Sequence, residues 1–238
     1  HDSAMDIDTG RLLDVYAGMA REGGARLVRG APVTGIERRS GVWSVHAGTE
    51  RVEVDIIVNA AGAWADHVAK LCGARALGIT PFRRTVAQLR TAPQPSDHLP
   101  LVLDLGGSFY FKPENGRLWL SPHDETPSAP CDAAPEEMDI ALAIDRFEQV
   151  VDWRVEAVER KWAGLRSFAP DRRPVYGFAP DCNGFFWCAG QGGFGIQTAP
   201  AGARFAAQLL SNAPRDAMTH ALDESLYAPA RFVQPAIL

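Results

Sequence analysis

The stretch FFWCAGQGGFG, residues 185–195, decides the fold of this chain, because a short apolar run leads directly into a loop with four glycines. Residues 185–189 predict a buried strand, and the apolar spacing from about 198 to 210 predicts a helix after the loop. A strand, a glycine loop and a helix in this order form a cradle where backbone N–H groups approach a phosphate or a cofactor. The stretch therefore predicts an α/β fold with a ligand site at the loop.

Gly190, Gly192 and Gly195 also match the G-x-G-x-x-G pattern of dinucleotide-binding folds, with Asp216 about 20 residues further on. The context does not fit, because residues 211–215 read SNAPR where a second parallel strand ending in the acid is required. We therefore interpret the loop as one whose amides face another part of a cofactor. A generic glycine turn is the alternative.

A second segment of the same kind lies at residues 55–65, DIIVNAAGAWA. Residues 55–59 predict a buried strand, which runs into small residues and then into a helix that ends at about Leu71. Small residues at the end of a buried strand let the backbone approach a ligand closely, although they also occur in tight turns packed in a core. We interpret this segment as part of the cofactor site.

The remaining patterns divide the chain into three parts. The first and last parts each contain an apolar strand, a run of small residues and a helix, and the middle part has a different pattern. In the first part, Asp8-Thr9 predicts the start of a helix that ends at Gly23-Gly24. Alternating residues in the middle part predict an antiparallel sheet with a hairpin turn at 114–116 and a helix at 136–151. The first part also contains four runs that predict an antiparallel meander: 26–29, 32–37, 42–46 and 51–54.

Composition excludes several classes of protein. The chain has 238 residues, of which 46% are hydrophobic, and no apolar run approaches the roughly 18 residues of a membrane span. Its net charge of -5 and its scattered Lys and Arg argue against nucleic-acid binding. The spacing of the four cysteines fits neither a redox pair nor a metal site. The chain also opens without a secretory signal, and we expect it to start within a longer protein.

Five motifs carry a family resemblance: 58–65 (VNAAGAWA), 81–84 (PFRR), 109–113 (FYFKP), 162–168 (WAGLRSF) and 190–198 (GQGGFGIQT). In this order and spacing they resemble the D-amino-acid oxidase family of FAD-dependent oxidoreductases, and within it most closely the bacterial D-arginine dehydrogenases. The resemblance runs from about Ala4 to Leu210. Members of the family open with a strand, a true G-x-G-x-x-G loop and an acidic residue, so this chain resembles a C-terminal portion.

The resemblance implies a discontinuous Rossmann-like FAD-binding domain, formed by residues 1–77 and 171–238, and an antiparallel-sheet substrate-binding domain at 78–170. It also implies that FAD is bound non-covalently, because Gly164 stands where covalent-flavin sarcosine oxidases carry the attachment cysteine. The backbone of Val33 resembles the residue that meets the adenine. The segment 59–65 is implied to lie near the FAD phosphates and ribityl chain.

The loop after residue 190 is implied to direct its amides and helix N-terminus at N1 and O2 of the flavin, where they stabilise the negative charge of the reduced ring. The full set of predicted cofactor-binding residues is Val33, Asn59, Ala60, Ala61, Gly62, Trp64, Gly192, Gly193, Phe194, Gly195, Ile196 and Gln197.

Arg84 and Arg166 are the candidates for binding a substrate carboxylate, because a guanidinium offers two parallel donors. Arg166 lies between apolar residues and needs an anionic partner, which is either a structural acid or, as the resemblance implies, the substrate. Tyr110 resembles the family tyrosine that adds a hydroxyl to the same carboxylate, although simple aromatic packing explains it equally well. We predict that Arg83 is a solvated surface charge, and we assign no catalytic role to any histidine.

The resemblance thus implies oxidation of an amino acid, in particular a D-amino acid, to the imino acid by hydride transfer to flavin N5. Oxygen or a quinone is the expected electron acceptor, no metal is expected, and the expected location is cytoplasmic or peripheral at the inner membrane. Alternatives are an inactive fragment or non-catalytic subunit, or a flavoenzyme that oxidises a hydroxy acid or glycerol 3-phosphate. We also expect Ile56–Val58 and Phe185–Ala189 to be interior strands whose open edge a second chain or second copy covers.

Overall fold

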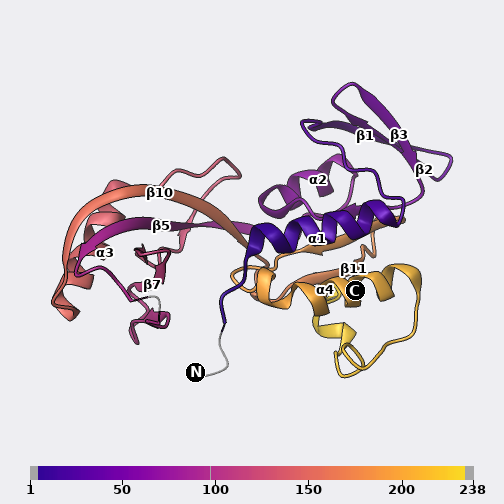
Figure 1. Ribbon diagram of the computed structural model, residues 1–238. Helices are drawn as coiled ribbons and strands as arrows, with labels where there is room; N and C mark the ends of the chain where they lie inside the picture. Colours follow the sequence, from indigo (N-terminus) through magenta and orange to yellow (C-terminus); the bar gives the residue numbers. More distant parts are fainter. Residues whose placement is uncertain (1–4, 97, 234–238) are drawn as a thin grey trace.

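The computed structural model describes residues 5–96 and 98–233, and Figure 1 shows them as two lobes joined by two long strands. These strands are β5 (Thr80–Ala92) and β10 (Arg154–Phe168), which pair antiparallel along their length. One lobe contains the N-terminal and C-terminal segments, and the other contains the middle of the sequence. The model is a mixed α/β structure with antiparallel sheets, as predicted.

The glycine-loop strand is the centre of a three-stranded sheet in the first lobe. β12 (Phe185–Ala189) pairs antiparallel with β11 (Val175–Phe178) and parallel with β4 (Ile57–Asn59). β12 is an interior strand, as expected. β4 begins at Ile57 and has one strand partner among the described residues, so it has the open edge that was expected, and the covering of that edge by a second chain or copy stays a prediction. Val58 in this strand is 44% exposed.

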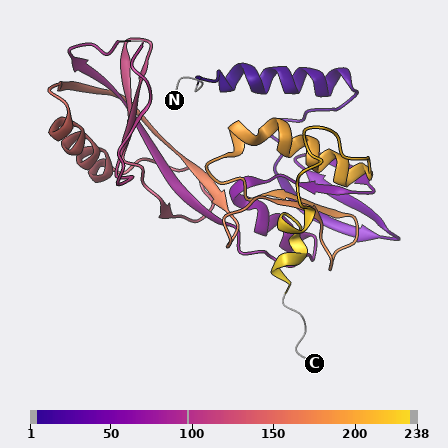
Figure 2. The ribbon, with the colours of Figure 1, turned by 90° about the horizontal axis from the view of Figure 1, so that it is seen from below.

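The helices of this lobe are α1 (Thr9–Glu22), α2 (Ala65–Leu71) and α4 (Gly195–Ser211), and short 3-10 turns follow: η1 (Gly62–Trp64), η2 (Glu224–Leu226) and η3 (Pro229–Phe232). The Asp8 carboxylate caps α1 by accepting a hydrogen bond from the Arg11 amide at 2.9 Å, as the sequence predicts. No residue of α1 is buried, and Figure 2 shows this helix standing clear of α4.

Three of the four predicted meander strands are present as an antiparallel sheet: β1 (Val33–Arg39), β2 (Val42–Ala47) and β3 (Glu50–Val54). The predicted strand at 26–29 is wrong. Leu27 and Val28 are half exposed, and the segment has no ladder partner in the described part of the chain. Its local pattern is typical of a strand, but a strand also needs a neighbour with which to share its backbone hydrogen bonds.

The second lobe is a six-stranded antiparallel sheet in the order β10-β5-β8-β7-β6, with β9 also paired to β5. The helix α3 (Glu137–Val150) packs on it through Ile140, Ala143 and Phe147. Asn115 and Gly116 form the predicted hairpin turn and both have positive φ angles, 51° and 71°. The remaining strands are β6 (Val102–Leu103), β7 (Tyr110–Glu114), β8 (Arg117–Ser121) and β9 (Thr126–Pro127).

The partly buried carboxylate of Asp66 connects α2 to the segment that leads into β5. Asp66 on α2 accepts hydrogen bonds from the backbone amides of Leu77, Gly78 and Ile79 at 3.0, 2.9 and 3.0 Å. Because these residues lead directly into β5, the position of the long strand pair follows from the position of α2. The division into domains at 78 and 170 stays a prediction.

Candidate functional site

The two segments singled out by their small residues leave the same sheet at the same end. β4 and β12 are parallel neighbours, and Asn59 stands beside Trp187 at their carboxyl ends. The Asn59 side chain is buried, donates to the Ala65 carbonyl at 2.8 Å and accepts from the Ala61 amide at 3.3 Å. Asn59 therefore shapes the turn after β4 rather than presenting its own amide to a ligand.

Two hollows lie along this turn and share Ala60 and Ala61. One, of about 300 Å³, is lined by Val33 together with residues 59–61. The other, of about 490 Å³, lies between residues 60–64 and Gly164 on β10. The predicted residues around this turn, Val33, Asn59, Ala60, Ala61, Gly62 and Trp64, thus line two hollows that share Ala60 and Ala61.

The glycine loop lies against Arg166 and Phe168 at the end of β10. Gly192 has a φ of +58°, and a Cβ there would lie 2.3 Å from the Phe168 ring, so no larger residue fits. A Cβ on Gly193 would lie 2.9 Å from Nη1 of Arg166. The helix α4 starts at Gly195, earlier than the predicted start near 198, and Phe194 provides no side-chain cap. The first N–H groups of α4 therefore lack side-chain partners, which favours negative charge there.

Arg84 on β5 and Arg166 on β10 meet on one face of the strand pair. Arg84 stands opposite Gly164 and Arg166 opposite Phe82, so the two arginines are diagonal neighbours. They line a cavity of about 430 Å³ together with Gly193 and Phe194. The predicted carboxylate-binding pair and the glycine loop therefore share one cavity.

The Arg84 guanidinium is buried without a full set of partners. Its side chain is 8% exposed, its Nε and Nη1 atoms have no hydrogen-bond partner, and its Nη2 is 4.0 Å from a Glu125 oxygen. Burial, and then the positive charge of Arg166, lower the pKa of Arg84, which nevertheless stays protonated at neutral pH. A buried cation with two unsatisfied donors calls for an anionic ligand.

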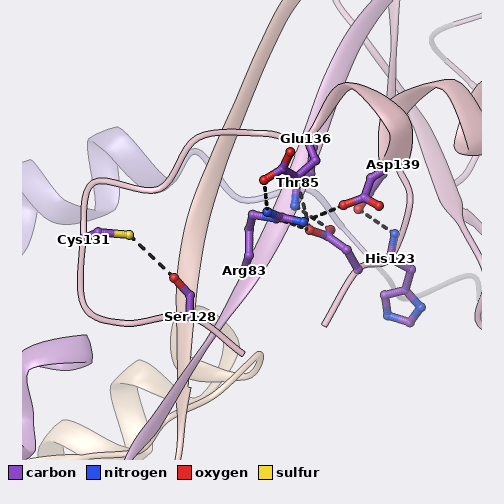
Figure 3. Close-up of polar contacts among 9 residues, drawn as sticks. Arg83, Thr85, His123, Ser128, Cys131, Glu136 and Asp139 are labelled. Carbon is purple, nitrogen blue, oxygen red and sulfur yellow. Dashed lines mark hydrogen bonds and ion pairs between the residues drawn. The ribbon is translucent and has the colours of Figure 1, made fainter. Parts of the chain in front are cut away.

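The prediction that Arg83 is a solvated surface charge is wrong, because its side chain is largely buried and forms ion pairs. Because side chains alternate along a strand, Arg83 points to the opposite face of β5, where its side chain is 15% exposed. Figure 3 shows its guanidinium between Glu136 and Asp139, which it contacts at 2.9 and 2.7 Å. It also donates to Asp124 at 3.2 Å. This arginine binds the strand to the start of α3.

Among the other residues that line the cavity, His123, Glu125 and Arg172 carry polar side chains that the sequence analysis did not predict as part of the site. His123 and Arg172 have positive φ angles of 55° and 62°, which are uncommon for residues other than glycine. All three lie outside helices and strands, so no periodic pattern marks them. Tyr110 is not part of the lining, but it packs edge-on against the His123 ring at 5.5 Å.

Not every predicted residue lines these three cavities. Gln197 lines a separate apolar cavity of about 380 Å³ beneath α4, with Tyr176 and Phe205. Ile196 is about half exposed, at 51%, whereas Trp64, 46% exposed, lines the hollow that also contains Gly164. Across residues 5–96 and 98–233, no group of three His, Cys, Asp or Glu side chains is placed to hold a metal ion. None of the described helices is long and apolar enough to cross a membrane.

Comparison with known families decides what this arrangement is. The family model described as FAD dependent oxidoreductase, abbreviated DAO, matches residues 1–209. The chain belongs to the DAO family of FAD-dependent oxidoreductases. The family part of the resemblance seen in the sequence is therefore confirmed.

Relatives in this family carry several different names. The chain is 27% identical over 200 residues to the hydrogen cyanide synthase subunit HcnC of Pseudomonas aeruginosa, covering 79% of this chain and 45% of the relative. It is 28% identical over 197 residues to glycine oxidase of the same species, covering 81% and 50%. The chain thus spans half or less of the length of these relatives.

A solved structure shows the same fold. Glycine oxidase from Geobacillus kaustophilus superimposes with a TM-score of 0.75 at 23% identity, covering 93% of this chain and 57% of that one. At this identity the likeness concerns the fold alone.

FAD is the cofactor of the DAO family, and the residues present fit it. The two hollows after β4 are lined by small residues within 60–62, and Gly192 brings backbone close to Phe168. If FAD is bound, residues 59–64 would hold it along its length, and the loop before α4 would hold the flavin end. The individual residue assignments stay predictions.

Proposed function

We propose that the whole protein uses FAD to oxidise the Cα–N bond of an amino acid of D configuration, giving an imino acid that hydrolyses to a keto acid and ammonia. The observation that carries this proposal is the buried Arg84 guanidinium, whose Nε and Nη1 lack partners inside a cavity shared with the glycine loop. An amino acid carboxylate is a planar anion of the size and geometry that this group requires.

Arg84 and Arg166 together bind the carboxylate in this proposal. Since the two guanidinium groups are diagonal neighbours on paired strands, a bound carboxylate is fixed in position and in rotation. Tyr110 adds its hydroxyl at the edge of the site. FAD, when bound, supplies the two-electron acceptor. No strong base is needed among the chain's residues when the amine binds in its neutral form.

Two comparisons support an amino acid as substrate. Relatives named glycine oxidase and sarcosine dehydrogenase match 81% and 78% of this chain. The D configuration rests on the resemblance to the bacterial D-arginine dehydrogenases. We carry over from them the type of reaction and not the side chain of the substrate.

A hydroxy acid is the second candidate, because Arg84 and Arg166 recognise a carboxylate whichever atom stands on Cα. Glycerol 3-phosphate is a third candidate: the cavity lining contains no lysine, but guanidinium groups bind a phosphate as well as a carboxylate. A structure described as L-alpha-glycerophosphate oxidase shares the fold at 21% identity, so the fold does not choose between these substrates.

The test is anaerobic bleaching of the flavin by a panel of D- and L-amino acids and the matching hydroxy acids, using the protein loaded with FAD. We expect Arg166→Leu to raise KM for the amino acid at least about tenfold. Arg160→Leu, an exposed arginine of the same strand, is the matched control and should leave KM unchanged. Bleaching by hydroxy acids alone, or an unchanged KM in Arg166→Leu, would contradict the proposal.

A colourless protein that does not respond to added FAD would support the alternative of an inactive fragment or a non-catalytic subunit. Oxygen and a quinone are both proposed as electron acceptors, and admitting each after bleaching shows which one restores the flavin colour. The exposed edge of β4 is the proposed place for self-association or for a second chain.

A further inference from the structure

The cavity that contains Arg84 has an excess of positive charge. Its lining carries three guanidinium groups, those of Arg84, Arg166 and Arg172, and one carboxylate, that of Glu125. One α-carboxylate neutralises one of the two excess charges. The cavity then still has one uncompensated positive charge.

The acidic residues near the cavity are already engaged. Glu125 forms an ion pair with Arg172 at 2.5 Å and stands 4.0 Å from Arg84. Asp124 points away from the cavity and accepts hydrogen bonds from Arg83 and from the backbone and hydroxyl of Thr85. No other carboxylate among the lining residues is available to balance the arginines.

Arg172 differs from Arg84 in its position within the cavity. Its side chain is 52% exposed, whereas that of Arg84 is 8% exposed, so Arg172 stands at the mouth and Arg84 at the inner end. The Arg172 guanidinium stacks on the Phe168 ring, 4.0 Å from its centroid, which holds the group over the cavity. Only its Nη2 contacts Glu125, and a guanidinium has five N–H donors. Donors therefore remain for a second anion.

We propose, on the basis of the function proposed above, that the substrate is an aminodicarboxylic acid whose second carboxylate binds at Arg172. The α-carboxylate binds at the buried end, at Arg84 and Arg166, and the side-chain carboxylate binds at the mouth. Both excess charges of the cavity are then neutralised. A side chain that carries a positive charge is repelled by the same groups, and a neutral one leaves a charge uncompensated.

Binding of succinate and of succinamate, its monoamide of nearly equal size, tests this proposal without any turnover. In thermal-shift titrations of the purified protein, we expect succinate to bind about tenfold more tightly, because it differs only in one charge. Arg172→Met should reduce this preference to less than about threefold, and Arg172→Lys should keep part of it. Arg173→Met, at an exposed neighbour outside the cavity, should leave it unchanged. Equal binding of the two ligands to the unaltered protein overturns the proposal.

Turnover separates this proposal from the function on which it rests. With FAD-loaded protein, we expect aspartate or glutamate of one configuration to be oxidised with a kcat/KM at least about tenfold above that of asparagine or glutamine. Faster oxidation of neutral or basic amino acids overturns the aminodicarboxylate while the amino acid oxidation stands. Tight succinate binding with no amino acid oxidised supports the anion site at Arg172 and overturns the oxidation.

Discussion

Arg83 and Arg84 are neighbours on β5, yet they lie on opposite faces of the strand pair and in opposite electrostatic conditions. Arg83 contacts three carboxylates, those of Asp124, Glu136 and Asp139. Arg84 is more deeply buried and has a single carboxylate at 4.0 Å. One face of the strand pair pairs its arginine with carboxylates, whereas the other leaves Nε and Nη1 of Arg84 without hydrogen-bond partners.

The pKa values of the two arginines shift in opposite directions for this reason. Burial by itself would lower the pKa of Arg83, but hydrogen bonds and charges from Asp124 and Asp139 outweigh it and raise that pKa. Burial and the neighbouring Arg166 lower the pKa of Arg84. A buried charge that the fold leaves without a partner is a candidate ligand site, because a structural charge without a partner would only reduce stability.

The largest expected effect comes from Arg84→Met. We expect kcat/KM for the substrate to fall by about 10³, since the buried donors that fix the carboxylate are lost. The free energy of unfolding should be unchanged or higher, because an unpaired buried charge is replaced by an apolar side chain of similar size. Steady-state kinetics and urea unfolding measure the two quantities, with Arg84→Lys as the control that keeps the charge. A large loss of stability would show that Arg84 is a structural residue.

Arg83→Met should show the reverse pattern. Three carboxylates lose their common cation, and Asp124 is only 6% exposed, so we expect the free energy of unfolding to fall by about 3 kcal/mol. KM should change by less than about threefold, because Arg83 does not line the cavity. Urea unfolding and steady-state kinetics on the same preparation give both values. If Arg83→Met instead impaired substrate binding with no loss of stability, the assignment of a structural role to Arg83 would be wrong.

The sequence could predict those parts of the molecule that depend on local pattern. The strand β12 with its glycine loop, the turn after β4 and the hairpin at Asn115 and Gly116 all follow from short runs of residues. The resemblance added Arg84 and Arg166, and the structure places both in one cavity with Gly193. Their roles still depend on the proposed experiments.

The remaining features depend on contacts between distant segments. Nothing local distinguishes Arg83 from Arg84, because the choice of face follows from how β5 pairs with β10 and packs under α3. The segment 26–29 has the composition of a strand but lacks a partner in the described part of the chain. Arg172 reaches the cavity from a turn, where sequence patterns carry no information about direction.

Thr85→Val is the smallest change that still tests the comparison, because it alters a single contact of the satisfied face. Thr85 is fully buried, and its hydroxyl donates to Asp124 at 2.9 Å while its backbone amide donates to the other carboxylate oxygen at 2.7 Å. Valine keeps the shape and the backbone bond, so we expect a loss of about 1 kcal/mol in the free energy of unfolding. Thr91→Val is the matched control, since the Thr91 hydroxyl donates to the neutral Pro93 carbonyl, and its loss should be smaller. Equal losses in the two variants would mean that the charge of Asp124 contributes little, and that burial alone holds this face together.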